Sequence, residues 1–379
     1  MKRKIDFGGA TATVSTFIPA SGGVTEHHAV IVCNDVLQPF PQQLESVLNA
    51  YHSLLADHLN GAVSVLKRYF LSDAANQADA VIAADMSDCA KSIIQQPPLD
   101  GTKIALWAYV MEGVDARPLE SGLYEVAHGE FRHLWNASAH NTATNSEYQT
   151  RLLFNEYVMQ LAQEGCTLAA NCIRTWLFVN DIDNNYGGVV AARNRVFFTQ
   201  GLTQDTHFIA STGIGGRQQD AAVLMQMDNY AVAGITPQQI HHLYAPTRMN
   251  RTSDYGVSFE RGTYVDYGDR RQVFISGTAS IDNKGRVVHA GNVVEQAARA
   301  WGNVETLLNE AGCSFDDVMQ VTVYLRDPSD YPLVSKFFSE RLGDMPFVIV
   351  GASVCRPAWL VEMECMAVKA ADNAAFPAF

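Results

Sequence analysis

Two glutamates, Glu362 and Glu364, lie two positions apart in an apolar stretch near the end of the chain. Side chains of a β-strand alternate between its faces, so residues two apart point to the same side. Crowded carboxylates resist double ionisation, which raises the pKa of one of them and suits it to act as a general acid. The alternative is an exposed strand face, or an ion pair with an arginine.

Three arginines could bind a carboxylate substrate: Arg356 close to the two glutamates, Arg261 further upstream, and Arg193 in a helical stretch. A guanidinium binds a carboxylate through two parallel hydrogen bonds, so a dicarboxylate requires at least two of them. Each arginine could equally be a surface or ion-pair residue.

Small residues and one cysteine complete the candidate site. Ser276, Gly277 and Thr278 follow an apolar strand and offer hydroxyl donors and close backbone approach. The alternative for these three is a tight strand end. Cys355 precedes Arg356 and could line the same pocket. No nearby motif marks Cys355 as a nucleophile, so a buried apolar role is expected.

The last third of the chain must position these residues. Its pattern predicts a strand at 273–280, a helix at 292–311 that ends at Gly312, a strand at 318–325, a helix at 331–342 that ends at Gly343, and closing strands at 347–355 and 360–368. One sheet covered by two helices is an α+β module.

The same order of elements occurs three times. A strand followed by aspartate recurs at 68–73, 176–181 and 323–327, and a closing strand recurs at 105–110, 225–232 and 361–368. We therefore predict modules at 1–114, 115–234 and 245–372, with 235–244 as a linker. In the first module, Ile93-Ile94 and residues 104–111 are predicted to form a closing hairpin. The alignment places Gln226 and Asp228, and in the first module Leu106 and Ala108, at the positions of Glu362 and Glu364.

The third module resembles the Rid (YjgF/UK114, endoribonuclease L-PSP-like) family. The matching pieces are Ile275-Ser-Gly277, Asn303-Val304, Ala311-Gly-Cys313, Val323-Tyr-Leu-Arg-Asp327 and residues 361–368. Members of this family have a chorismate-mutase-like fold and form homotrimers with ligand sites between subunits. The resemblance implies that three fused modules form an intrachain pseudo-trimer, and that the chain is a monomer or a weak higher oligomer.

From Asn171 to the end, the chain also resembles chorismatases, which cleave the enolpyruvyl ether of chorismate and release pyruvate. The matching pieces include Ile173-Arg-Thr-Trp176, Tyr186 with Arg193, residues 209–214, Ser258-Phe-Glu-Arg261, residues 276–280 with His289, Val354-Cys-Arg-Pro357 and residues 360–364. The resemblance implies that Glu362 and Glu364 are catalytic, and it favours Glu362 as the general acid. It implies a substrate site made of Arg356, Arg261, Arg193, Ser276, Gly277, Thr278, Tyr255 and Cys355. The first module is expected to lack a counterpart in two-module chorismatases.

Two functional hypotheses follow from these resemblances. The first is a chorismatase-like enzyme that acts on chorismate or a related cyclic carboxylate. The alternative is a Rid-type protein that binds a small carboxylate, or an imine deaminase relative, without chorismate turnover. Imine deaminases of the family hold their substrate with an arginine in the penultimate strand, and no arginine lies between Phe347 and Cys355.

Composition narrows the classes of partner. The chain has 379 residues, 47% of them hydrophobic, and a net charge of −13, which argues against a nucleic-acid partner. No apolar run is long enough for a transmembrane helix and no signal peptide is recognised, so we expect no membrane partner. Seven cysteines without CxxC pairs indicate a reduced, cytoplasmic protein. The histidines lack metal-ligand spacing, and we expect no metal and no cofactor.

Overall fold

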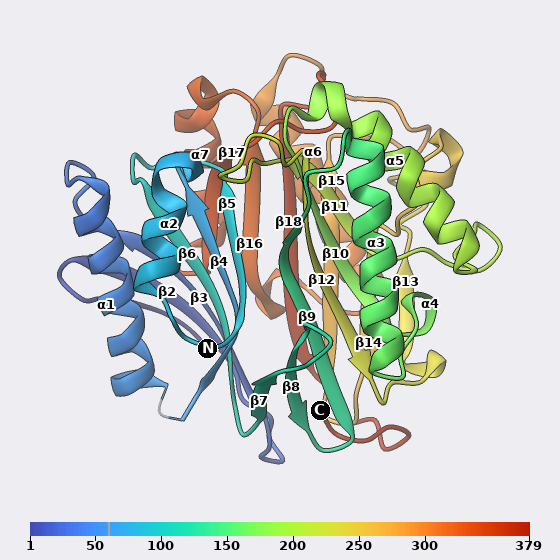
Figure 1. Cartoon of the computed structure of the whole chain (residues 1–379), viewed down its shortest axis with the longest axis horizontal. Coiled ribbons are helices and arrows are strands. Elements are labelled where there is room, and N and C mark those ends of the chain that lie inside the picture. Colours follow the sequence, from blue (N-terminus) through green and yellow to red (C-terminus); the bar gives the residue numbers. More distant parts are fainter. Residues whose placement is uncertain (60) are drawn as a thin grey trace.

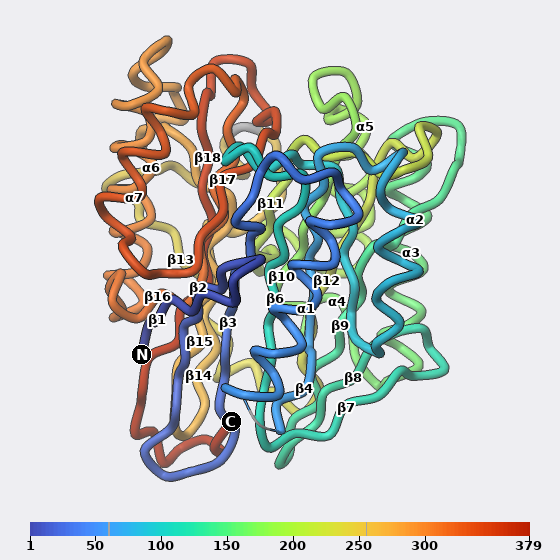
Figure 2. The backbone as a smooth tube through the Cα atoms, turned by 90° about the vertical axis from the view of Figure 1, so that its left-hand side faces the viewer, coloured from blue at the N-terminus to red at the C-terminus, as the bar shows by residue number. Residues whose placement is uncertain are grey.

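The computed structural model describes residues 1–59 and 61–379, and for Tyr255 it describes the backbone but not the side chain. Three six-stranded sheets face one another in the middle of the molecule, and the helices lie outside them. Figure 1 shows α1 and α2 on one side and α3 and α5 on the other. Figure 2, turned by 90°, shows α6 and α7 covering a third side. This is the predicted α+β pseudo-trimer of three similar modules.

The three modules contain the following elements. The first has β1 (Lys2–Asp6), β2 (Ala10–Phe17), β3 (Thr25–Cys33), α1 (Phe40–His58), β4 (Val63–Leu71), α2 (Ala74–Ala84), β5 (Ala90–Gln95) and β6 (Ile104–Glu112). The second has β7 (Asp115–Pro118), β8 (Tyr124–His128), β9 (Phe131–His140), α3 (Ser146–Gln163), α4 (Leu168–Asn171), β10 (Cys172–Val179), α5 (Ile182–Thr199), β11 (Ala210–Gly215) and β12 (Met225–Ala233). The third has β13 (Ile240–Leu243), β14 (Gly262–Asp266), β15 (Arg270–Ala279), α6 (Val293–Glu310), β16 (Val318–Leu325), α7 (Tyr331–Leu342), β17 (Phe347–Gly351) and β18 (Val361–Ala370).

All three sheets share one strand order, which is β13-β14-β15-β18-β16-β17 in the third module. The last strand lies between the third and fourth strands, and the fifth strand pairs parallel with the fourth. The predicted closing hairpin of the first module is therefore wrong. β5 pairs with β4, and β6 lies between β3 and β4, so the two strands are neighbours in sequence but not in the sheet.

The same contact joins each pair of modules. Gln95 N donates to Arg217 O, Gly215 N donates to Ser353 O, and Gly351 N donates to Pro97 O, each at 2.8 Å. In every case, the end of one module's fifth strand bonds to the loop before the next module's last strand. This repetition is what a pseudo-threefold arrangement requires.

The central strands of each sheet are buried on both faces, which explains their nearly continuous apolar sequences. In the first module, Leu106 and Ala108 belong to the core beneath the outer helix, whereas Ala105 and Trp107 belong to the central core shared by all three modules. The register of β6 on β4 places Ala105 and Trp107 at the positions of Glu362 and Glu364. The predicted counterparts Leu106 and Ala108 were off by one residue, and a shift of one exchanges the two faces.

The strands that open each sheet were harder to predict. β1, β2, β7 and β8 are absent from the prediction, and β13 falls within residues 235–244, which were expected to be a linker. β13 pairs antiparallel with β14, so this stretch adds an edge strand to the third sheet. Among the residues that the structure describes, the helices lack the length and apolarity needed to cross a membrane.

Candidate functional site

A cavity of about 310 Å³ lies between the second and third modules. Helix α5 and strand β11 form its wall in the second module, and β15, β18 and the loop before β18 form its wall in the third. Six predicted site residues meet there: Glu362, Gly277, Arg193, Arg261, Arg356 and Cys355. Three others, Glu364, Ser276 and Thr278, lie behind this wall. The side chain of Tyr255, the remaining predicted residue, is outside what the structure describes.

Glu362 is the acidic group of the cavity. It lies on β18 opposite Ala279 of β15 and Tyr324 of β16, and only 5% of it is exposed. Burial and the nearby charge of Glu364 raise the pKa of Glu362 to about 8, although Arg261 and Arg174 oppose the shift. Glu362 is therefore mainly protonated at neutral pH and can donate a proton into the cavity.

Gly277 of β15 lets the Glu362 carboxyl group lie against the backbone. A Cβ atom at this position would be 2.0 Å from Glu362 Oε1 and 2.9 Å from Thr212 Cγ2. Both distances are shorter than a non-bonded contact allows. The predicted close approach at Gly277 was expected for a substrate carboxylate, and in the structure the Glu362 side chain occupies this position, so a larger residue there would displace it.

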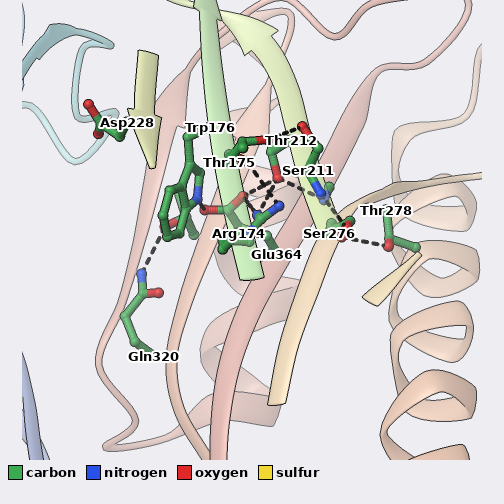
Figure 3. Close-up of polar contacts among 12 residues, drawn as sticks. Arg174, Thr175, Trp176, Ser211, Thr212, Asp228, Ser276, Thr278, Gln320 and Glu364 are labelled. Carbon is green, nitrogen blue, oxygen red and sulfur yellow. Dashed lines mark hydrogen bonds and ion pairs between the residues drawn. The ribbon is translucent and has the colours of Figure 1, made fainter. Parts of the chain in front are cut away.

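Glu364 has a different environment from Glu362, although both side chains are on one face. Its carboxylate accepts hydrogen bonds from Arg174 Nη2 at 2.7 Å, from Trp176 Nε1 at 2.9 Å, and from the Thr212 hydroxyl (Figure 3). All three donors belong to the second module. The two glutamates therefore differ: Glu364 is in an ion pair with Arg174, whereas Glu362 faces the cavity with a raised pKa.

Ser276 and Thr278 support the cavity wall without lining it. The Ser276 hydroxyl donates to Glu260 O at 2.6 Å and accepts from Ser211 N at 2.9 Å, which ties β15 to β11 (Figure 3). The Thr278 hydroxyl donates to Ser276 O at 2.8 Å. The Ser276 hydroxyl therefore joins the second and third modules, whereas the Thr278 contact stays within β15.

The three cavity arginines differ in the contacts that their guanidinium groups make. Arg261 Nη2 donates to Asn250 O at 3.1 Å, and the Arg356 guanidinium lies 4.6 Å from the centre of the Trp359 ring. Arg193 is 1% exposed, and its buried Nε and Nη2 atoms have no hydrogen-bond partner among the described residues. Buried donors are nearly always paired in native proteins, so Arg193 is suited to receive a carboxylate.

The environment of Cys355 disfavours the thiolate form of its side chain. Burial and the neighbouring Glu362 raise the pKa of its thiol to about 12. A neutral thiol is a weak nucleophile, so Cys355 shapes the cavity as the sequence predicted.

Sequence reasoning missed several residues of the site. Tyr186 lies on α5 and lines the cavity, and a Cβ at Gly213 would be 2.8 Å from its ring. Arg174 and Thr212 hold Glu364. Tyr186, Arg174 and Thr212 are all in segments that carry the chorismatase resemblance. Their roles depend on contacts between modules, which spacing within one module does not reveal.

The other two intermodule clefts have different residues at the positions of Glu362, Gly213 and Gly277. Strand register places Gln226 and Ala105 at the position of Glu362, and Ile93 and Ile349 at the position of Gly213. Ser138 occupies the position of Gly277, and its hydroxyl accepts a hydrogen bond from Ile93 N at 3.0 Å. The acid and the glycine that admits Tyr186 therefore occur together in the cleft between the second and third modules.

Known proteins resemble the chain both in sequence and in structure. A family model described as Endoribonuclease L-PSP matches residues 259–369. A RutC family protein of Pyrococcus abyssi is 35% identical over 99 residues, which is 26% of this chain and 78% of that protein. The mouse 2-iminobutanoate/2-iminopropanoate deaminase is 34% identical over 77 residues, 20% of this chain and 57% of that protein. The chain belongs to the Rid/YjgF (endoribonuclease L-PSP) family.

A solved chorismatase structure resembles most of the molecule. Its TM-score is 0.63 at 18% identity, and the match covers 80% of this chain and 92% of the chorismatase. At this identity the likeness concerns the fold. Because 80% of the chain is more than the second and third modules contain, the match extends into the first module. At least part of the first module therefore has a chorismatase counterpart, which corrects the expectation that it has none.

Proposed function

We propose that this protein is a chorismatase-like enzyme, which cleaves the enolpyruvyl ether of chorismate or of a related cyclic carboxylate by general acid catalysis. One observation carries the proposal: Glu362, with a pKa of about 8, faces an arginine-lined cavity of about 310 Å³. A protonated carboxyl group beside several guanidinium groups matches a reaction that needs an acid and a substrate with two carboxylates.

The proposed reaction begins with proton transfer from Glu362 to the methylene carbon of the enolpyruvyl group. The C=C electron pair forms the new C–H bond, and the ether carbon becomes an oxocarbenium ion. Capture by water, which loses a proton to the Glu362 carboxylate, gives a hemiketal that breaks into pyruvate and the ring alcohol. Capture by a ring hydroxyl is the alternative that the residues leave open. In either case Glu362 regains its proton.

The arginines orient the substrate for this proton transfer. Arg193 supplies buried donors that the described residues do not use, and Arg261 and Arg356 place two further guanidinium groups at the cavity. A cavity of this size lies within the range of small-molecule sites, which is roughly 300–1,000 Å³. Bidentate contacts would hold the enolpyruvyl methylene carbon near Glu362.

The alternative is a Rid-type carboxylate-binding protein, or an imine deaminase relative, without chorismate turnover. The similarity to the mouse protein named 2-iminobutanoate/2-iminopropanoate deaminase supports the deaminase alternative. The sequence from Phe347 to Cys355, which contains β17, has no arginine. The family's imine deaminases are expected to carry their substrate arginine in this strand, so the observation favours the chorismatase-like reaction.

Incubation of the purified protein with chorismate tests the proposal. We expect pyruvate, measured through NADH oxidation by lactate dehydrogenase, together with an equal amount of a new ring product separated by chromatography. Calorimetric binding of chorismate without pyruvate would establish the binding protein instead. Ammonia release from 2-iminobutanoate without pyruvate from chorismate would establish the deaminase.

A further inference from the structure

Four charged side chains form a buried layer where the three sheets meet. They are Arg68 from β4 of the first module, Arg174 from β10, Asp228 from β12 and Glu364 from β18, and each is at most 3% exposed. Arg68 Nη2 lies 2.8 Å from Asp228 Oδ2, and Arg174 Nη2 lies 2.7 Å from Glu364 Oε2. Arg68 Nη1 is also 3.9 Å from Glu364 Oε1. We call these four residues the charge layer.

Aromatic rings enclose the charge layer. The Arg68 guanidinium lies 5.1 Å from the centre of the Trp107 ring, 4.7 Å from Trp176 and 5.0 Å from Phe178. Such surroundings screen charges poorly, so each charge acts strongly on its neighbours. Arg68 Nη1 has no hydrogen-bond partner among the described residues, and Glu364 is the second carboxylate within its reach.

The charge layer is balanced, with two guanidinium groups and two carboxylates. Glu362, two residues from Glu364 on the same strand face, would add a third carboxylate if it ionised. The cavity arginines would be engaged by the carboxylates of a bound substrate. Two members of the charge layer already act on Glu362, because the charge of Glu364 raises its pKa and the charge of Arg174 lowers it.

We propose that Arg68, which the first module supplies, is a positioning residue for the reaction in the cleft between the second and third modules. It acts through Asp228 and Glu364 on Glu362 and does not touch the substrate. The inference deepens the proposed function and rests on Glu362 being the acid there. It gives the first module a role in catalysis, although the cavity residues come from the other two modules.

Several other groups also face Glu362 and remain in place in the variants below. They are Glu364 on β18, Arg174 on β10, Tyr324 on β16, Arg193 and Tyr186 on α5, Arg261 before β14, and Cys355 and Arg356 in the loop before β18. The variants change only the charges of Arg68 and Asp228.

The test compares pH profiles of kcat for two single variants and their combination. Asp228→Asn leaves the Arg68 cation without its main anion, which favours ionisation of Glu362. We expect the alkaline limb of the profile to move about one pH unit toward acid, as a nearby unpaired cation would cause. Arg68→Gln removes the cation and keeps a donor for Asp228, so the limb moves toward alkali. The double variant should return the limb close to its wild-type position, with little change in KM throughout.

Glu26→Gln is the matched control. Glu26 is fully buried and pairs with Arg270 across the first and third modules at 2.7 Å, so the chemical change is the same as in Asp228→Asn. We expect it to lower stability and to leave the alkaline limb in place. An unchanged limb in both single variants, or a double variant that does not restore it, would overturn the inference. If one single variant does not fold, the direction of the shift in the other decides.

A substrate-free measurement separates this inference from the proposed function. The protein is labelled with ¹³C at glutamate carboxyl carbons, and the Glu362 signal is assigned by its loss in Glu362→Gln. The signal should titrate earlier in Asp228→Asn and later in Arg68→Gln. If the Glu362 signal shifts as expected in the two variants but the wild type releases no pyruvate, only the proposed function is refuted. If the wild type releases pyruvate but the Glu362 signal does not shift in either variant, only the role of Arg68 is refuted.

Discussion

At Glu362, burial and a neighbouring carboxylate hold a proton at a pH where an exposed glutamate would be ionised. The spacing of Glu362 and Glu364 predicted that one of them would be an acid. The family resemblance favoured Glu362 as the acid. In the structure the two glutamates differ because Arg174, Trp176 and the Thr212 hydroxyl, all from another module, donate hydrogen bonds to Glu364. Residues that meet only after the modules pack carry no signal in the spacing of one strand.

The raised pKa of Glu362 links stability to pH. Between the ordinary pKa of 4.5 and the folded-state pKa of about 8, the folded protein holds a proton that the unfolded chain has lost. Stability should therefore fall as pH rises through this window, by about 1.4 kcal/mol per pH unit from this group. Glu362→Gln lacks the effect. Urea unfolding of both proteins across this window should show a difference that grows in favour of the variant, whereas a constant difference would contradict the raised pKa.

Arg193 should contribute mainly to substrate binding. Arg193→Lys keeps the positive charge but loses the planar fork, so we expect KM for chorismate to rise about 10–100-fold with a smaller change in kcat. Arg195→Lys, on the exposed face of the same helix, is the matched control because Arg195 pairs only loosely with Glu147, at 3.5 Å. Initial-rate measurements decide the point, and equal KM values for the two variants would exclude Arg193 from the site.

At the scale of elements, the apolar patterns predicted most helices and central strands. Helix α7 (Tyr331–Leu342) and strand β16 (Val318–Leu325) begin and end where the sequence indicated. Pairing was predicted less well, because β5 and β6 are adjacent in sequence but separated in the sheet by β4. The register of β6 in the first module was predicted wrongly because both faces of this strand are buried. Its sequence therefore does not show which residues face the centre of the molecule.

The position of β15 against β18 makes Gly277 a sensitive site. Gly277→Ala should push the Glu362 carboxyl group away, since the new Cβ would be 2.0 Å from Oε1. We expect kcat to fall at least about tenfold, because a small displacement of a reacting group is costly. Gly351→Ala in β17 is the control, since its nearest neighbour would be Leu99 at an ordinary 3.4 Å. A Gly277→Ala enzyme with wild-type kcat would show that the acid does not need this position.

At the scale of the whole molecule, one chain supplies three modules where a trimer supplies three subunits. The repeated landmarks predicted this arrangement, and the equivalent hydrogen bonds at all three interfaces match it. Fusion lets each cleft change separately. Glu362 is kept in one cleft, while the corresponding residues in the others are Gln226 and Ala105. A homotrimer of identical chains has no such freedom.

The covalent pseudo-trimer should need no partner chains. Its three sheets already cover one another's inner faces, so we propose that the protein is a monomer in solution or associates only weakly. Size-exclusion chromatography with light scattering should give the mass of one chain at micromolar concentration. A stable assembly of three chains that persists on dilution would contradict this expectation.

The most direct test of the account is the rate of pyruvate release from chorismate by the wild type and by Glu362→Gln, measured across a range of pH. We expect wild-type kcat to fall about tenfold per pH unit above the Glu362 pKa of about 8, because the protonated form is the active one. Glu362→Gln should bind chorismate with similar affinity and release pyruvate about 10²–10⁴-fold more slowly, without the alkaline fall. Release by the variant at the wild-type rate would show that Glu362 is not the acid.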